Sequence, residues 1–210
     1  MTTEPREVVI TPGKSALLIV GAEYDFVSPK GRLYVGPNTK ARVDSMARFL
    51  ARARAARMKV FFIHQSRPAD SPEFSSFGAA PYLLEGTMGS EITEQLRPVF
   101  DEEVIEARTF DCFVKTNLER QFQRYDVRPL EDSIVVMGGK ANVGIFHAAS
   151  GLSQRHFRVV VPRDCVHGEK ESEERIMRHI SGSGLNYNTT VTTSDEIRIA
   201  ESLGYFVKSY

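Results

Sequence analysis

The sequence of 210 residues has no excess of charge of either sign, because 27 acidic residues balance 27 basic ones. A chain with zero net charge exerts no overall attraction on nucleic acid or on an anionic membrane surface. Five arginines between positions 42 and 57 alternate with apolar residues, which is typical of the solvent-facing side of a helix. We therefore expect neither nucleic acid nor membrane as a partner, and any anion must be bound by locally placed groups.

Long apolar runs and cysteine pairs are also missing. The longest apolar run, Ala16–Ala22, is far shorter than the ~20 residues that cross a bilayer, and the N-terminal residues do not resemble a signal peptide. The two cysteines, Cys112 and Cys165, lie outside any Cys-x-x-Cys or Cys/His spacing, which argues against a disulfide framework and a zinc site. The sequence thus predicts a cytoplasmic protein that holds no metal and no cofactor.

Short aliphatic runs alternate with stretches of helical spacing along the chain. The aliphatic runs predict strands at residues 16–20, 59–64, 103–106, 133–137 and 157–161, and a short last strand at 190–192. The helical spacing predicts helices over residues 39–58, 90–96, 113–125, 169–181 and 194–203, and another that opens near Asn142. Each helix follows a strand, which is the pattern of parallel α/β proteins.

No repeat or linker interrupts this alternation, so we expect one doubly wound α/β domain over residues 1–210. The predicted architecture is a three-layer α/β/α sandwich around a mostly parallel sheet of six strands. Residues 1–14 are polar and contain two prolines, and we expect them to form an extended N-terminal arm.

The carboxyl ends of parallel strands meet at one edge of a sheet, where ligands of α/β proteins usually bind. The predicted strands end at Gly21, at His64–Gln65, at Ala107–Arg108 and at residues 138–144. The last of these contains two glycines and opens a helix, whose free N–H groups attract anions. Residues 66–89 form a long irregular segment, which is typical of a lid or binding loop. We therefore expect a ligand cleft at this edge.

Five segments along nearly the whole chain carry short motifs in a fixed order. Residues 16–26 (ALLIVGAEYDF) are similar to ALLVIDMQNDF, residues 85–89 (EGTMG) to GTxG, and residues 138–144 (GGKANVG) to G-x-x-T-x-x-C. Residues 104–118 carry most of V-I-x-K-x-R-x-x-A-F and T-x-L, and residues 193–196 (TSDE) match T-x-D-E. Together they resemble the isochorismatase-like, or cysteine hydrolase, family. The resemblance implies its fold and a homodimer or homotetramer.

The resemblance also implies a site made of an aspartate, a lysine and a cysteine, in which the cysteine attacks an amide or imide carbonyl. In this sequence those three positions are Gly21, Ala107 and Gly144, so a standard cysteine amidohydrolase is the least favoured interpretation. An alignment shifted by eight residues would give the lysine role to Lys115. The vinyl-ether hydrolase branch of the family commonly has glycine in place of the cysteine, but it needs the aspartate as general acid.

Two carboxyl-edge residues are candidates for proton transfer, and each has a structural alternative. Glu23 is the carboxylate nearest to the vacant aspartate position, and burial can raise its pKa into a useful range; alternatively it bonds to the backbone. His64 ends the second strand and is either an acid–base group or a hydrogen-bonded structural histidine. The residues expected to bind substrate are Gln65, Arg108, Phe110, Lys140, Asn142 and Gly144.

Two functions follow from these observations. The first is a divergent hydrolase that acts on a small anionic, aromatic or cyclic metabolite without a covalent cysteine intermediate. The second is a catalytically inactive family member that binds a metabolite or a protein partner. Lys140 beside a helix N-terminus favours an anion in either case.

Overall fold

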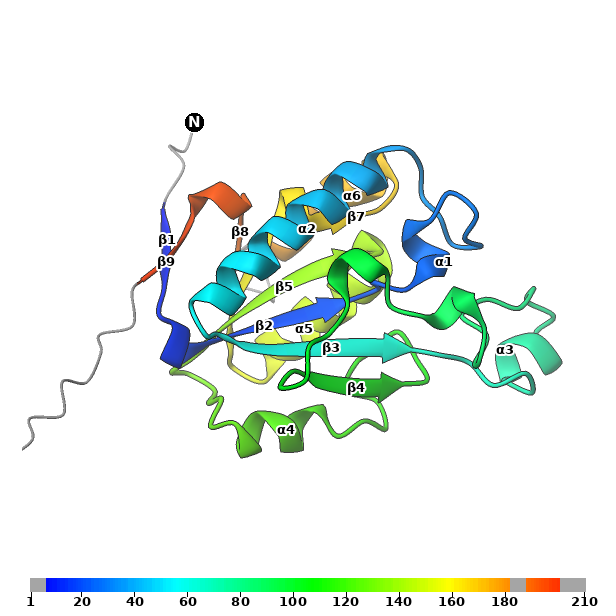
Figure 1. The fold of residues 1–210 in the computed structure, drawn as a ribbon, viewed down its shortest axis with the longest axis horizontal. Helices are drawn as coiled ribbons and strands as arrows, with labels where there is room; N and C mark the ends of the chain where they lie inside the picture. Colours follow the sequence, from blue (N-terminus) through cyan, green and yellow to red (C-terminus); the bar gives the residue numbers. More distant parts are fainter. Residues whose placement is uncertain (1–6, 182–187, 201–210) are drawn as a thin grey trace, which may run out of the picture.

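A parallel sheet lies at the centre of the computed structural model, which describes residues 7–181 and 188–200 (Figure 1). The strand order is β4-β3-β2-β5-β6-β8, with β7 beside β5, and every pair is parallel. The strands are β2 (Ser15–Val20), β3 (Lys59–Gln65), β4 (Glu103–Ala107), β5 (Ser133–Gly139), β6 (Arg158–Pro162), β7 (Val166–His167) and β8 (Thr189–Thr192). The expected sheet of six strands therefore becomes one of seven, because β7 has two residues and gives no periodic signal in the sequence.

Helices cover both faces of this sheet, which confirms the three-layer architecture. One face packs against α2 (Asn38–Ala55) through Val43, Met46 and Leu50. The other face packs against α4 (Leu118–Arg124), α5 (Phe146–Gln154) and α6 (Lys170–Ile180). The central strand β2 is buried along its whole length because helices lie on both of its faces. Two single-turn helices, α1 (Tyr24–Val27) and α3 (Pro72–Ser75), lie in loops at the carboxyl edge of the sheet.

The arginines of α2 are bound within the chain. Arg42 pairs with Glu173, Arg54 pairs with Glu102, and Arg52 donates to two backbone carbonyls. Arg48 donates to Ser45 of the same helix. The helix therefore uses its positive charge to fasten neighbouring segments. Among the described residues no helix is long and apolar enough to cross a membrane.

The helix expected over residues 113–125 is shortened to α4. A turn precedes it, in which Asp111 accepts the N–H of Phe113 at 2.9 Å and Thr116 donates its hydroxyl to the Cys112 carbonyl at 2.6 Å. Lys115 then has a φ of 55°, which lies in the left-handed region and is incompatible with a continuing helix. Side-chain hydrogen bonds to the backbone thus replace the helical ones.

Two other expected helices are wrong in part. In place of the helix expected over residues 90–96, the chain forms two 3-10 turns, Met88–Ser90 and Glu94–Leu96. They are separated because Ile92, between them, forms an isolated bridge with Glu23. After the 3-10 turn Ser194–Glu196, the chain forms strand β9 (Ile197–Ile199), which pairs with β1 (Val8–Ile10) from the expected N-terminal arm. Residues 201–203 of the expected helix lie outside the described residues.

Candidate functional site

The structure brings the four predicted strand ends together. Gln65 pairs with Ala107 across β3 and β4, and Val20, which precedes Gly21, pairs with Gly138 across β2 and β5. The chain then passes through a π-helical turn, Ala141–Ile145, into α5. Gly144 lies in that turn, so it faces the end of β2.

The carbonyl group of Gly139 fills the space between Gly21 and Gly144. A Cβ atom at either glycine would lie less than 3.0 Å from this carbonyl, closer than real Cβ atoms approach. Gly21 also has a φ of 62°, which is unfavourable for any residue with a side chain. The peptide bond between Gly139 and Lys140 is cis. Neither glycine position has room for a side chain in this backbone.

His167 of β7 packs directly against Gly139 and was not predicted from the sequence. Its ring is fully buried, and Nε2 lies 2.9 Å from the Gly21 carbonyl, so Nε2 carries the proton and donates it. Nδ1 is buried and has no hydrogen-bond partner within the described part of the chain. Burial, with a smaller repulsion from Lys140, lowers the pKa of His167 to about 4. The ring is therefore neutral at pH 7.

Glu23 is a buried carboxyl group at the end of β2. Its Oε1 atom accepts the backbone N–H of Gln65 at 2.6 Å, and Oε2 has no partner among the described residues. Burial raises the pKa of Glu23 to about 7, against the lowering effect of the backbone hydrogen bonds. Glu23 thus binds to the backbone, as in its structural alternative, and its second carboxyl oxygen has no partner among the described residues.

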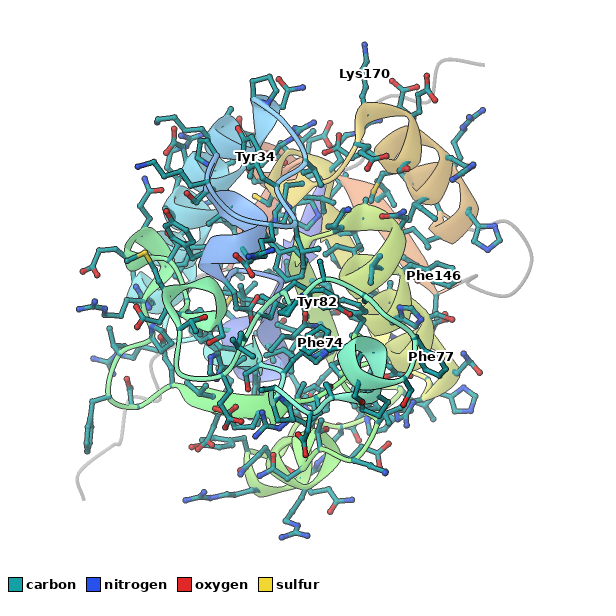
Figure 2. The ribbon with its side chains drawn as sticks, turned by 90° about the vertical axis from the view of Figure 1, so that its right-hand side faces the viewer. Tyr34, Phe74, Phe77, Tyr82, Phe146 and Lys170 are labelled. Atoms are coloured by element: carbon teal, nitrogen blue, oxygen red, sulfur yellow. The ribbon has the colours of Figure 1, made fainter. Side chains whose placement is uncertain are left out.

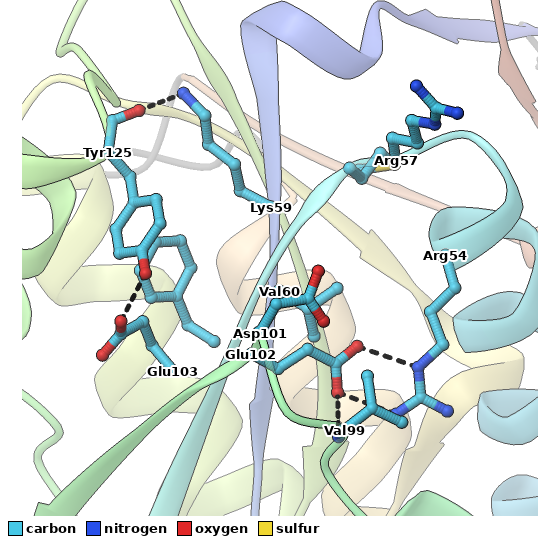
Figure 3. A pocket seen from close by; sticks show the side chains of 11 residues that line it. Arg54, Arg57, Lys59, Val60, Val99, Asp101, Glu102, Glu103 and Tyr125 are labelled. Atoms are coloured by element: carbon cyan, nitrogen blue, oxygen red, sulfur yellow. Dashed lines mark hydrogen bonds and ion pairs between the residues drawn. The ribbon is translucent and has the colours of Figure 1, made fainter.

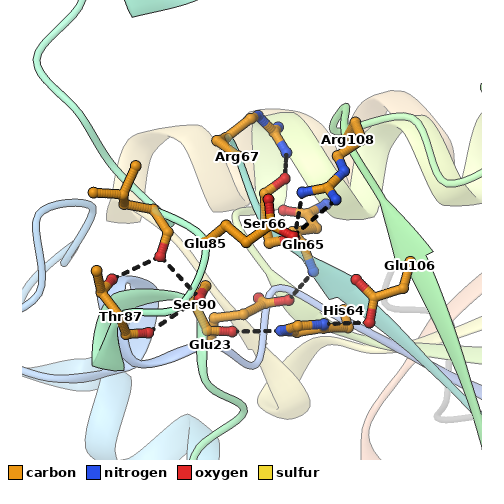
Figure 4. A network of polar contacts seen from close by, with 11 residues as sticks. Glu23, His64, Gln65, Ser66, Arg67, Glu85, Thr87, Ser90, Glu106 and Arg108 are labelled. Atoms are coloured by element: carbon orange, nitrogen blue, oxygen red, sulfur yellow. Dashed lines mark hydrogen bonds and ion pairs between the residues drawn. The ribbon is translucent and has the colours of Figure 1, made fainter. Parts of the chain in front are cut away.

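His64 uses both ring nitrogens within the protein (Figure 4). Nδ1 lies 2.7 Å from Glu106 Oε1 and Nε2 lies 2.7 Å from the Ser90 carbonyl. Because both partners are acceptors, they favour the doubly protonated ring. Burial lowers the pKa of His64, but the hydrogen bond and charge of Glu106 and the Ser90 carbonyl outweigh it, so that the pKa is raised. The acid–base role of His64 stays a prediction.

Gln65 and Arg67 lie at the end of β3, with Arg108 beside them (Figure 4). The side chain of Gln65 is 1% exposed, and neither its oxygen nor its nitrogen has a partner in the described structure. Arg67 is also 1% exposed, and its guanidinium lies over the ring of Phe110 at 4.9 Å. Sequence reasoning missed Arg67, because a lone arginine before a proline carries no motif.

The other predicted binding residues lie nearer to the surface. Arg108 donates to Ser66 and pairs with Glu85 at 3.1 Å, with half of its side chain exposed. Lys140 is 3.9 Å from Glu169, and Asn142 is exposed. Lys115, which the shifted alignment would place in the site, is exposed in the turn before α4, eight positions beyond the end of β4.

Aromatic side chains cover the carboxyl edge of the sheet. Phe110 stacks on Tyr82 with ring centres 6.0 Å apart, and Tyr82 meets Phe74 edge to face at 5.3 Å. Figure 2 shows Phe74, Phe77 and Tyr82 on this side of the molecule. Phe77 is 83% exposed and takes no part in this packing. The loop of residues 66–89 thus contributes an aromatic roof to the site.

Asp25 fastens this loop, since its carboxylate accepts the backbone N–H groups of Leu83 at 2.7 Å and of Arg32 at 3.2 Å. Asp25→Ala is expected to lower the free energy of unfolding by about 2–4 kcal/mol, because hydrogen bonds to a charged acceptor are lost and a buried N–H is left unpaired. Urea unfolding measures this change. The control is Asp70→Ala, since Asp70 is exposed in the same loop and is expected to change stability by less than about 0.5 kcal/mol. Equal losses for the two variants would contradict the role given to Asp25.

A cavity of about 430 Å³ lies at the opposite end of the sheet, near the starts of β3 and β4 (Figure 3). Most of its charged side chains are bonded within the protein. Arg54 donates twice to Glu102, Lys59 donates to the Tyr125 carbonyl, and the Tyr125 hydroxyl donates to Glu103. This cavity therefore offers few free polar groups for a ligand.

Neither a metal site nor a reactive thiol is present among the described residues. They contain no group of three or more His, Cys, Asp or Glu side chains suited to hold a metal ion. Cys112 and Cys165 are buried, and burial raises the pKa of each thiol to about 12. Neither cysteine is poised to form a thiolate.

The fold is a parallel α/β sandwich, and the candidate site lies at the carboxyl ends of its central strands. The sequence model of the isochorismatase domain matches residues 15–196, and the chain therefore belongs to the isochorismatase family. This confirms the family that the sequence motifs resemble.

Two relatives of known activity or role are similar over most of the chain. The maleamate amidohydrolase of Pseudomonas putida is 28% identical over 192 residues, which cover 88% of this chain and 86% of that protein. The secreted isochorismatase effector Isc1 of Verticillium dahliae is 26% identical over 152 residues, 72% of each chain. At these identities the relatives support the family and leave the substrate open.

Solved structures confirm the fold. The cysteine hydrolase from Pseudomonas syringae pv. phaseolicola superposes with a TM-score of 0.78 at 21% identity, over 93% of this chain and 96% of that one. The N-carbamoylsarcosine amidase from Thermoplasma acidophilum has a TM-score of 0.72 at 26% identity, over 88% and 99% of the two chains. The chain thus has an isochorismatase-family hydrolase fold.

Proposed function

We propose that this protein binds a small anionic, aromatic or cyclic metabolite in the cleft at the carboxyl ends of β2, β3 and β4, and does not form a covalent cysteine intermediate. It is then a family member that has kept the ligand cleft without the family's chemistry. A single domain over residues 1–210, association into a homodimer or homotetramer, and a cytoplasmic location belong to the same proposal.

The position of the Gly139 carbonyl carries this proposal. The motifs that resemble the family align its aspartate and cysteine with Gly21 and Gly144, and its lysine with Ala107. The carbonyl lies less than 3.0 Å from where a Cβ atom would stand at either glycine. This placement supports a site without the nucleophile and its base, because a backbone carbonyl occupies the space that their side chains would need.

Free polar groups beside the aromatic roof support ligand binding. The amide of Gln65 is buried with both polar atoms unpartnered among the described residues, which costs free energy unless a ligand or water satisfies them. Lys140 at the start of the helical turn adds positive charge near the helix N-terminus. Phe110 and Tyr82 offer flat apolar surfaces.

A second candidate function, hydrolysis without a covalent intermediate, is favoured by one observation. Glu23 has a pKa raised to about 7 by burial and an unpartnered oxygen, Oε2, which suit a general acid or base at neutral pH. His64, bonded to Glu106, is the second residue that we would assign to proton transfer. In this candidate, water attacks the substrate directly.

Ammonia release from small amides separates the two functions. With maleamate, nicotinamide and N-carbamoyl compounds, we expect the protein to release ammonia no faster than buffer, because no nucleophile is present. The maleamate amidohydrolase of Pseudomonas putida is the positive control for the assay. Release that disappears in Glu23→Gln would favour the second candidate, and release that survives in this variant would contradict both.

A further inference from the structure

Arg67 is a fully buried cation that the proposed function leaves unused. It lies just beyond β3, two residues after Gln65, and only 1% of its side chain is exposed. Its Cζ atom lies 4.9 Å from the ring centre of Phe110 and 5.9 Å from that of Tyr82. These two rings are almost parallel, at 13°. The guanidinium therefore lies against the aromatic roof over the carboxyl edge of the sheet.

The guanidinium of Arg67 has one carboxylate partner. Nε donates to Glu73 Oε1 at 2.9 Å, and Nη1 donates to the Ser66 carbonyl at 3.2 Å. Within residues 7–181 and 188–200, Glu73 is the one carboxylate that pairs with Arg67. A buried cation needs such a partner, because removing an unpaired charge from water is costly.

Glu73 is a weakly held partner for so buried a cation. It lies in α3, a single helical turn in the loop of residues 66–89, and 31% of its side chain is exposed. Its second oxygen accepts the Ser71 hydroxyl of the same loop at 2.8 Å. In the structural pair of Arg54 and Glu102, by contrast, two hydrogen bonds of 2.8 Å hold a carboxylate that is only 6% exposed. Glu73 is thus the more exchangeable carboxylate.

We propose that Arg67 anchors the carboxylate of a planar ligand, and that the Glu73 carboxylate occupies the same guanidinium when the cleft is empty. This inference deepens the proposed function and rests on it. The ligand carboxylate forms a paired hydrogen bond with the Arg67 fork, and its ring stacks beside Phe110 and Tyr82. The unpartnered amide of Gln65, two residues earlier in the chain, binds a further polar group of the same ligand.

Benzoate binding tests the exchange between ligand and Glu73. Glu73→Gln removes the competing charge, so we expect benzoate to bind this variant about tenfold more tightly than the unchanged protein, measured by titration calorimetry. The matched control is Glu85→Gln, which removes another carboxylate of the same loop, one that pairs with Arg108. The affinity of this control for benzoate is expected to stay within about twofold of that of the unchanged protein, since exposed ion pairs contribute little free energy. An equal gain in both variants, or no benzoate binding to Glu73→Gln, would overturn the proposal.

Arg67 itself is tested in the Glu73→Gln background. Adding Arg67→Gln is expected to reduce benzoate affinity at least about tenfold, because the charge-assisted hydrogen bonds to the ligand are lost. Since Glu73 is already glutamine in this background, the second change leaves no unpaired carboxylate behind. Circular dichroism checks that this double variant is folded, and an unchanged affinity in folded protein removes Arg67 as the anchor. Benzamide separates the two proposals. If benzamide binds, Gln65→Leu weakens its binding, and Glu73→Gln does not change the affinity for benzoate, then the proposed function stands and the role given to Arg67 is wrong. If neither compound binds to any variant, both proposals are wrong.

Discussion

Replacing Glu23 with glutamine is expected to stabilise the protein increasingly as pH rises. The difference in the free energy of unfolding between the variant and the wild type should grow by about 3 kcal/mol between pH 4 and pH 8. Burial raises the pKa of Glu23 from 4.5 to about 7, so the folded state holds this proton while the unfolded state releases it. The contribution of Glu23 alone therefore lowers the stability of the protein as pH rises from about 4.5 to 7, by roughly 1.4 kcal/mol per pH unit. Glutamine has no proton to release and still accepts the Gln65 N–H.

His167 acts in the opposite direction over nearly the same range. Its pKa is lowered from 6.5 to about 4 by burial, so its contribution to stability is complete above pH 6.5 and is lost as pH falls through 4. In the wild type the two effects largely cancel between pH 4.5 and 6.5. Glu23→Gln keeps only the effect of His167 and should become less stable as pH falls. His167→Gln keeps only the effect of Glu23 and should become more stable as pH falls. Urea unfolding from pH 4 to pH 8 measures both profiles, and profiles parallel to the wild type would contradict the assigned shifts.

Alanine at Gly21 is expected to produce the largest loss of stability of any substitution discussed, about 4 kcal/mol. Two costs combine there, because alanine is strained at a φ of 62° and its Cβ would meet the Gly139 carbonyl. Gly144→Ala meets the same carbonyl at an ordinary φ, and we expect it to cost about 2–3 kcal/mol. Both values are measured as changes in the free energy of unfolding.

Two further glycines separate the causes. Gly78 has a φ of 71°, and no atom lies within 4 Å of the position that a Cβ would take, so Gly78→Ala tests backbone strain alone and should cost about 1 kcal/mol. Gly13 has neither strain nor contact, and Gly13→Ala should change stability by less than about 0.5 kcal/mol. If Gly144→Ala is as mild as Gly13→Ala, the carbonyl does not close the site, and the proposal of a site without covalent catalysis loses this support.

The centre of the sheet was predictable from the sequence because β2, β5 and β6 are buried along most of their length and have continuous aliphatic runs. The strand expected at residues 16–20 is Ser15–Val20, and that expected at 59–64 is Lys59–Gln65. The convergence of their carboxyl ends followed from the parallel order alone. Helix α2 was also predicted closely, since its apolar residues recur with helical spacing.

The errors fall where contacts distant in sequence decide the local structure. Ile197–Ile199 is a strand because β1 lies beside it, and nothing within residues 194–203 signals that partner. The helix over residues 113–125 begins late because Asp111 accepts a backbone N–H and Thr116 donates to a backbone carbonyl in the turn before it. The helix propensity of a short stretch of sequence reflects neither the strand pairing nor these side-chain hydrogen bonds.

The candidate site was predictable as a place but not as a set of contacts. The sequence indicated Glu23, His64 and Gln65 at the strand ends, and the structure has them there. It did not indicate that Glu106 and Ser90 bind both nitrogens of His64. Arg67 and His167 were missed because each depends on groups far along the chain, such as Phe110 and Gly21.

The pairing of β1 with β9 has a consequence for the order of folding. Val8 lies beside Ile197 and Ile10 beside Ile199, so this pair joins positions near opposite ends of the described chain. Closing so long a loop is entropically costly, and such contacts form late. Strand β1 is synthesised before β9, and Ile10, which is buried in the folded chain, cannot be covered by that pairing until β9 has been made. We expect the two-stranded sheet to form after the central sheet.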